Sequence, residues 1–522
     1  MPRHDHPRKR ALIVNCYADE TRRPVRRTGK VPQSLAPAFL AGAFHPDRWD
    51  ITLHNEHVDG PLADAVLLGW ADVLVLTGLT TSIDRMRMVT AYARTLNPKV
   101  LVVGGGHLAR ALPAFCATFM DVVCQGDAEE VGEVIAGHFG AGYAAERFSP
   151  RIDLVHWMGR IGYAESTKYC NFKCSFCVLT AEHRKFSAHP LEAFREQLTA
   201  VGQRQYVIFI DNNFYGSSRA SFLERLAVVK ERWQAGQFLG WAALVTGDFF
   251  ARPENLALGK DAGCIGLFSG VESFSTEWTS FVDKRQNLGH SPVEMIRSVL
   301  EAGMIFEYGV IFDIYERSIA DIRREIEFML ARDDITLPAF LSLPIPYPGT
   351  PYFYNLLDRG ALLPGTKLRD LDSTTISAHP RDGIAEAARL VRDLQSMAGY
   401  RWKVARHGAR FVRRWRSSLN RDQMIMGLAN NLLMMSPLLG TLPASVGARR
   451  APRTFVSSTE PLDVWYTPSM RVDARYASYF EPVMLTTASG ALDAALAEDI
   501  DRGRPGRRPV LSPVVPMERV AT

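Results

Sequence analysis

The feature of this chain that most constrains its fold is a repeated alternation of short apolar segments with amphipathic helical ones. In residues 11–138 five β-rich segments are separated by helical stretches, and they read ALIVNCY, DITLHNE, DVLVLTG, KVLVVGG and DVVCQGD. Strands that are apolar along most of their length are typical of a parallel sheet with both faces covered. The alternation therefore predicts an α/β fold that begins with a doubly wound, Rossmann- or flavodoxin-like domain over residues 1–145.

A second alternation begins at residue 161, after a linker at 146–158. Its six β-rich segments read IGYAEST, QYVIFIDN, GWAALVTG, IGLFSGVES, FEYGVIFDI and LPAFLSLPI, and helical segments separate them. Six successive βα units predict a (β/α)6 partial TIM barrel over residues 155–365. In both kinds of sheet, ligands bind at the carboxyl ends of the strands.

Residues 366–522 follow a less regular pattern and predict a smaller, mainly helical C-terminal region. The segment 400–418 is a basic helix with Val404, Phe411 and Trp415 on one face. Such a helix usually packs its apolar stripe on its own domain, and contact with anionic lipid or an acidic partner is the alternative. The Arg- and Pro-rich last twenty residues predict disorder.

Charge and composition indicate which binding partners and which cellular compartment to expect. A net charge of +5, from 61 basic and 56 acidic side chains, is too small to indicate nucleic-acid binding. The basic start MPRHDHPRKR is followed by ALIVNCY, which lacks the apolar core of a signal peptide. The apolar run at 424–440 is interrupted by polar residues and Pro437, so it is a poor membrane span. Seven cysteines, three of them clustered, favour a reducing compartment, and we expect a cytoplasmic protein.

The clustered cysteines are Cys170, Cys174 and Cys177, which directly follow the first strand expected in the barrel. Structural zinc usually takes four ligands from paired cysteines, and no second pair exists here. His183 or His189 could supply a fourth ligand, so zinc stays open. An iron–sulfur cluster fits the spacing better, because three thiolates on a four-iron cluster leave one iron free to bind another molecule.

The C-x3-C-x2-C spacing, with Phe176 before its last cysteine, resembles the motif of radical S-adenosylmethionine (SAM) enzymes. Five later stretches also resemble that family in the same order: IDNNF (210–214), SGVES (269–273), KRQN (284–287), GVIFDIYE (309–316) and PIPYPGTPYF (344–353). The resemblance implies a [4Fe–4S] cluster on the three cysteines, SAM on the open iron, and an external electron donor of the flavodoxin or ferredoxin type. It also implies SAM contacts from Asp211, Asn213, Glu272 and Asn287, with Glu272 on the ribose hydroxyls.

A doubly wound domain directly before such a barrel resembles the cobalamin-dependent branch of the family. The turns TGLTTS (77–82) and GGGHLA (104–109) stand where that branch receives the nucleotide tail of cobalamin. By themselves these turns are ordinary strand-to-helix turns; the resemblance implies that the tail lies beside Thr80, Thr81, Gly104, Gly105 and Gly106. The D-x-H-x-x-G loop that places a histidine on cobalt is missing, and His45 comes late and without that context. Cobalamin is therefore expected to bind without a protein histidine ligand.

The resemblance implies methyl transfer to an unactivated carbon of a biosynthetic intermediate. A cobalamin-dependent radical cyclisation or oxidation without methyl transfer is the alternative within enzymes. A non-catalytic metal-binding scaffold is the alternative outside them. The sequence names neither the substrate nor an acid–base residue. A small-molecule or amphiphilic substrate is expected, nucleic acid is not, and peripheral membrane contact stays open.

Overall fold

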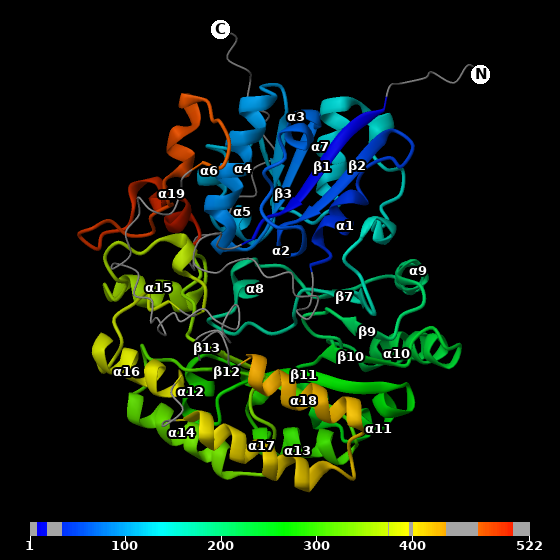
Figure 1. Cartoon of the computed structure of the whole chain (residues 1–522), viewed down its shortest axis with the longest axis vertical. Coiled ribbons are helices and arrows are strands. Elements are labelled where there is room, and N and C mark those ends of the chain that lie inside the picture. The colour runs from blue at the N-terminus through cyan, green and yellow to red at the C-terminus, as the bar shows by residue number, and fades with distance from the viewer. Residues whose placement is uncertain (1–7, 18–33, 374, 396–399, 435–467, 505–522) are drawn as a thin grey trace.

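The computed structural model describes residues 8–17, 34–373, 375–395, 400–434 and 468–504. An N-terminal α/β domain lies above a second α/β domain, and the C-terminal region runs along both (Figure 1). Of the last twenty residues, for which disorder is expected, residues 505–522 lie outside the described residues, as does the end of the apolar run at 424–440. Within the described residues no helix is long and apolar enough to cross a membrane.

The N-terminal domain contains five parallel strands in the order β2-β1-β3-β4-β5. Their order is that of a doubly wound sheet, with the reversal of direction between β1 and β3, where ligands bind in such folds. The fold predicted for this part of the chain is confirmed. The strands are β1 (Lys9–Asn15), β2 (Trp49–Asn55), β3 (Val73–Thr77), β4 (Leu101–Gly104) and β5 (Val122–Val123). The main helices are α1 (Ala36–Ala41), α3 (Ala65–Trp70), α4 (Ile83–Leu96) and α7 (Glu130–Phe139).

The second domain contains six parallel strands that neighbour one another in chain order. Within the described sheet the first and last strands do not pair, so the sheet is an open half-barrel, as the six βα units predicted. The strands are β6 (Ile161–Ala164), β9 (Tyr206–Phe209), β10 (Gly240–Leu244), β11 (Cys264–Glu272), β12 (Ile305–Ile311) and β13 (Phe340–Ser342). The helices between them are α9 (Leu191–Val201), α10 (Arg219–Gln234), α11 (Glu254–Asp261), α13 (Pro292–Glu301) and α14 (Ile319–Ala331).

The C-terminal region begins with helices that pack on the half-barrel. They are α16 (Ile384–Gln395), α17 (Trp402–Trp415) and α18 (Arg421–Met434). The apolar face of α17 is buried, as Val404, Phe411 and Trp415 show, and α17 packs against α14. Trp415 Nε1 also donates to the Asp333 carbonyl at 3.1 Å. The prediction that this basic helix packs its apolar stripe within the protein is confirmed, and the surface that it covers belongs to the half-barrel.

The chain then returns to the N-terminal domain. The helices η9 (Ala474–Phe480) and α19 (Ala494–Arg502) lie against α4 and α6 (Pro113–Cys116) (Figure 1). Asp499 accepts hydrogen bonds from the backbone N–H groups of Ala114 and Phe115, at 3.0 and 2.8 Å, where α6 begins. Tyr354 of the second domain donates its hydroxyl to the Ile500 carbonyl at 2.8 Å. Residues 468–504 thus tie the two domains together.

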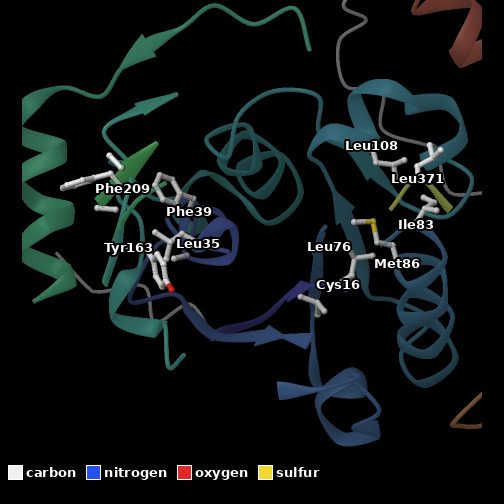
Figure 2. Packing of buried hydrophobic residues seen from close by; sticks show 14 of the residues in the cluster. Cys16, Leu35, Phe39, Leu76, Ile83, Met86, Leu108, Tyr163, Phe209 and Leu371 are labelled. Carbon is white, nitrogen blue, oxygen red and sulfur yellow. The ribbon is translucent and has the colours of Figure 1, made fainter. Parts of the chain in front are cut away.

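One hydrophobic core runs through both domains. Leu35 and Phe39, before and within α1, lie beside Tyr163 and Phe209 of the half-barrel (Figure 2). On the other side of the N-terminal sheet, Leu371 of the C-terminal region joins Leu108 and Met86 (Figure 2). Since apolar burial crosses the domain boundary, the two sheets are held in a fixed relation.

The N-terminal domain also buries an ion pair between Arg85 and Glu56. Their closest atoms are 2.7 Å apart, and the two side chains are 5% and 0% exposed. Glu56 accepts a further hydrogen bond from the backbone N–H of Leu62 at 2.8 Å. The pair thereby links α4 to the short helix α2 (Glu56–Asp59), which follows β2.

Replacing Arg85 by Met should lower the free energy of unfolding of the N-terminal domain by about 3–5 kcal/mol, because it leaves a buried carboxylate without its counter-charge. Urea unfolding followed by circular dichroism measures the change. Arg147→Met is the control, since the Arg147–Glu196 pair is largely exposed and its loss should have no measurable effect. Equal stability of the two variants would contradict the expectation.

Candidate active site

The cysteine loop starts at the carboxyl end of the first barrel strand and is closed at its base by a short ladder. β7 (Thr167–Lys168) pairs antiparallel with β8 (Ser187–Ala188). Beneath the ladder, Asp211 is fully buried and accepts from Ser166 Oγ at 2.7 Å and Thr167 Oγ1 at 2.6 Å. These bonds give Asp211 a structural part in the loop, and its direct contact with SAM stays a prediction.

The three predicted ligands lie on this loop as free thiols. The N–H of Cys177 donates to the Cys174 carbonyl at 3.1 Å, and α8 (Val178–Ala181) starts directly after Cys177. Burial raises the pKa of Cys170, and it raises the pKa of Cys177 to about 12. Buried thiols that resist ionisation become thiolates when a metal binds them.

Among the described residues, no three His, Cys, Asp or Glu side chains are gathered around a single point where one metal ion could sit. A closed zinc site would need all of its ligands to converge on one atom. His189, a possible fourth zinc ligand, instead contacts Glu165, with 3.0 Å between Nε2 and Oε1. A four-iron cluster needs no such convergence, because each thiolate binds a different iron. The assignment of the three cysteines to a cluster stays a prediction.

The ends of β11 and the KRQN stretch form the wall opposite the cysteines. Lys284 Nζ lies 2.7 Å from Glu272 Oε1, and both side chains are mostly buried. Gln286 Nε2 donates to Cys174 Sγ at 3.3 Å. Lys284 also lies 5.8 Å from the centre of the Phe176 ring. The wall therefore places a positive charge and a hydrogen-bond donor next to the cysteine loop.

Glu272 has an unusual backbone. Its φ is +64°, in the left-handed region, and the β11–β12 register shifts between Gly270 and Glu272. A bulge of this kind re-aims a side chain, and non-glycine residues in this region cluster at functional sites. The strain is consistent with the ligand contact predicted for Glu272 from the sequence.

Two buried side-chain oxygens of this wall, Gln286 Oε1 and Asn287 Oδ1, have no hydrogen-bond partner within the described part of the chain, and neither has Asn213 Oδ1 beside the cysteine loop. The amide nitrogen of Asn287 is used, because it donates to the Gly270 carbonyl at 2.9 Å. All three atoms are acceptors, so they suit a ligand that is rich in donors and carries positive charge. SAM, with its ammonium, sulfonium and ribose hydroxyls, is such a ligand. Sequence reasoning quoted KRQN but did not single out Lys284 or Gln286.

A cavity of about 240 Å³ lies between the two domains. From the N-terminal domain it is bordered by α1, by the ends of β3 and β4, and by the predicted residues Gly104, Gly105 and Gly106. From the second domain it is bordered by the cysteine loop, through Tyr169 and Leu179. The cavity opens at the carboxyl ends of the strands, where both folds are expected to bind ligands.

The other two residues predicted to hold the cobalamin tail do not border this cavity. Thr80 and Thr81 form the short helix η1 (Thr80–Ser82), and each is 4% exposed. The helix η6 (Leu368–Asp370) from the C-terminal region packs against η1. The sequence could not show that a distant segment would cover this turn, and the contact predicted for the two threonines stays a prediction.

Glu182 joins the two sides of the cavity. It lies just after α8, its side chain is 2% exposed, and it contacts His107 Nδ1 with Oε1. Arg110 Nη1 lies 3.0 Å from its other oxygen, close enough for an ion pair. Burial and the nearby Arg110 lower the pKa of His107 to about 4, so its ring is neutral near pH 7. No motif in the sequence indicated this link.

His107 is relevant to the expectation that no protein histidine binds cobalt. Among the described residues it is the histidine that borders the cavity, whereas His45 does not. Its Nδ1 atom is engaged with Glu182, and His107 begins α5 (His107–Ala111) rather than lying in the loop after β1. The prediction that cobalamin binds without a protein histidine ligand remains untested.

Comparison with known proteins places these features in a class. Residues 25–136 match the family model of the B12 binding domain. The chain is similar to the hopanoid C-2 methylase of Rhodopseudomonas palustris, at 22% identity over 54% of this chain and 56% of the relative. It is also similar to the bacteriochlorophyllide d C-12(1)-methyltransferase of Chlorobaculum tepidum, at 23% identity over 55% of this chain and 66% of the relative. The matches thus span only about half to two thirds of these relatives.

Solved structures show the same fold. The cobalamin-dependent SAM radical enzyme OxsB superposes with a TM-score of 0.56 at 13% identity, over 83% of this chain and 80% of its own. The radical SAM methyltransferase TsrM from Kitasatospora setae gives 0.51 at 16% identity, over 68% of this chain and 78% of its own. The matches confirm the resemblance to cobalamin-dependent radical SAM enzymes of the methyltransferase kind. The α/β fold predicted from the sequence, a B12-binding domain followed by a radical SAM half-barrel, is confirmed as well.

Replacing Glu182 by Gln should loosen both edges of the cavity, because Arg110 and His107 lose the buried carboxylate that links them to the cysteine loop. Hydrogen exchange followed by mass spectrometry should show faster exchange in residues 104–111 and 178–184, by at least about tenfold, which corresponds to about 1.4 kcal/mol. Glu196→Gln, which removes an exposed ion pair, is the control. Unchanged exchange in both segments would show that Glu182 does not join the domains.

Proposed function

We propose that this chain is a cobalamin-dependent radical SAM enzyme that transfers a methyl group to an unactivated carbon of a small-molecule intermediate. The observation that carries the proposal is the placement of the cavity. It lies between the carboxyl edges of the two sheets, with the glycine loop after β4 on one side and the cysteine loop on the other. A reaction that needs two cofactors at one carbon requires such a meeting of two binding edges.

The residues present fit three groups. Cys170, Cys174 and Cys177 would hold a [4Fe–4S] cluster. SAM would be held by Asn213, Glu272 and Asn287, together with Gln286, and Asp211 would support that site from below. The cobalamin tail would lie beside Gly104, Gly105 and Gly106, with Thr80 and Thr81 as further predicted contacts. When bound, these groups supply a reducing electron, a radical source and a transferable methyl group.

The side chains of the protein position and shield the reacting groups. Lys284 is buried beside the cysteines and lowers the electrostatic cost of keeping three thiolates together. It also fixes the Glu272 carboxylate, so that one oxygen of this group is held while the other can accept from a ligand. Cys174 is 6% exposed, and its burial restricts access of water to the site of radical formation.

The relatives indicate only a broad class of substrate. The two curated relatives are named for a hopanoid and a bacteriochlorophyllide, both large and mostly apolar molecules. We propose an apolar small molecule here as well, and an external electron donor of the flavodoxin or ferredoxin type. A cytoplasmic setting is part of the proposal, and it agrees with seven free cysteines in the structure.

The first test removes the predicted cluster ligands one at a time. In anaerobically reconstituted protein, Cys170→Ala, Cys174→Ala and Cys177→Ala should each lower iron content and abolish reductive cleavage of SAM to 5′-deoxyadenosine, because each removes one of the three thiolates expected to bind the cluster. Matched controls are Cys16→Ala, Cys116→Ala and Cys264→Ala, which lie in buried cores elsewhere and should keep both properties. Cleavage retained by Cys174→Ala would sink the assignment.

The second test fills the cavity from the side of α1. Ala36 borders the cavity at the first position of that helix, so Ala36→Phe should occupy space that the cobalamin tail needs. Bound cobalamin, measured by its visible spectrum after reconstitution, should fall at least about tenfold, while iron content stays unchanged. In the unsubstituted protein, the electron paramagnetic resonance spectrum of cob(II)alamin should lack nitrogen splitting. Splitting from a histidine nitrogen would refute the histidine-free site, and no cobalamin in any preparation would refute the methyl-transfer proposal.

A further inference from the structure

Helix α17 carries a run of basic residues that the fold and the cofactor assignments do not fully use. Residues 400–418 contain seven Lys and Arg side chains and no Asp or Glu. The apolar stripe of the helix is buried, and the helix packs against α14. Exposed helix faces usually mix both charge signs, because like charges one turn apart repel. A helix with basic side chains alone therefore indicates a negatively charged partner, unless contacts within the protein account for each of them.

Three of the basic side chains hold the helix on the half-barrel. Lys403 forms an ion pair with Glu327 of α14. Arg414 Nη1 lies 3.0 Å from Asp333 Oδ1, and Arg410 donates to two backbone carbonyls at the end of α14. The two carboxylates that contact α17 are thus already engaged, and these three side chains have a structural role.

Three other arginines lie on the opposite side of the helix. Arg406, Arg413 and Arg416 are exposed, and within the described chain they form no hydrogen bond or ion pair. Because successive helix residues are rotated by about 100°, all three fall within about 40° of Trp402 and on the side opposite Phe411. Trp402 is 60% exposed, which is unusual for so large an apolar side chain. We call Trp402, Arg406, Arg413 and Arg416 the arginine stripe.

The stability of the helix accounts for only part of this stripe. Basic side chains near a helix C-terminus interact favourably with the helix dipole, which favours Arg413 and Arg416. The dipole does not favour Arg406, which lies nearer the start of the helix, and the first turn contains no acidic residue to pair with it. It also gives no reason for an exposed tryptophan at the first helical position. These two positions indicate a surface that contacts another molecule.

The shape and chemistry of the stripe suit a membrane surface. From Trp402 to Arg416 it runs straight for about 21 Å along one helix. Helix α17 lies at the end of the molecule away from the N-terminal domain, so a flat surface can approach it without meeting that domain (Figure 1). Guanidinium groups bind phosphate oxygens, and tryptophan side chains favour the level of lipid headgroups.

We propose that the arginine stripe binds the protein peripherally to membranes that contain anionic phospholipids. The apolar face of α17 is buried in the protein, so the contact is with headgroups rather than with the acyl interior. Binding of this kind is reversible and sensitive to salt, because it depends on exposed charges. The stripe does not border the cavity between the two domains, so the inference does not depend on the proposed function.

The test measures binding of the full-length, anaerobically reconstituted protein to lipid vesicles by flotation. One set of vesicles contains equal parts of phosphatidylglycerol and phosphatidylcholine, and the other contains phosphatidylcholine alone. At low salt, about 50 mM, the protein should bind the anionic vesicles at least about tenfold more tightly than the neutral ones. At about 500 mM salt the preference should disappear, because the Debye length is then shorter than the reach of the side chains.

The variants locate the effect on α17. The double variant Arg406→Gln, Arg413→Gln should bind anionic vesicles at least about tenfold more weakly, because each basic residue at such a surface strengthens binding about fivefold. Its thermal midpoint should not change, since both side chains are exposed. The matched control Arg147→Gln, Arg475→Gln removes the same charge from exposed positions outside α17 and should keep the binding.

Three results would overturn the inference: no preference for anionic vesicles, a preference that high salt leaves unchanged, or a preference that the double variant keeps. A short DNA duplex or polyglutamate that binds through the same arginines more tightly than the anionic vesicles would also overturn it, because the partner would then be a different polyanion. Cleavage of SAM separates the inference from the proposed function. Its absence from fully reconstituted protein refutes the radical SAM proposal, and vesicle binding still decides the role of the arginine stripe.

Discussion

The structure depends on the meeting of two parallel sheets at their carboxyl edges. The carboxyl ends of parallel strands lead into loops that can bind ligands, and here the loops of both domains border one cavity. The core that continues through Phe39 and Tyr163 fixes this meeting, and the buried Glu182 carboxylate links the cysteine loop to Arg110 on the other side. Because the two proposed cofactor sites share a boundary, cofactors bound in both could act on one substrate.

The buried polar side chains fall into two kinds, those whose hydrogen bonds are made within the chain and those that keep an atom without a partner among the described residues. Asp211 and Asp499 are satisfied within the chain, and they hold a loop and a helix start in place. Asn213, Gln286 and Asn287 each keep an acceptor oxygen buried and unmatched within the described residues. Because such atoms cost free energy, they suit a ligand with donors, as proposed for SAM.

The electrostatic surroundings of the cysteines are likewise suited to a bound ligand. Burial raises the pKa of Cys170 and Cys177, which favours neutral thiols until a metal binds. Lys284 offsets part of this cost and holds Glu272, which has a left-handed backbone and belongs to the same wall.

The sequence by itself determined the two sheets, their strand segments, the cysteine loop and the family resemblance, because apolar periodicity and motif spacing are local properties of the chain. It also placed Glu272 and Asn213 at or just beyond strand ends, and Asn287 in the KRQN stretch. Only the tertiary structure showed that Glu182 reaches His107 and that η6 covers Thr80 and Thr81. Those contacts join residues far apart in the chain, and no local pattern records which distant surfaces will meet.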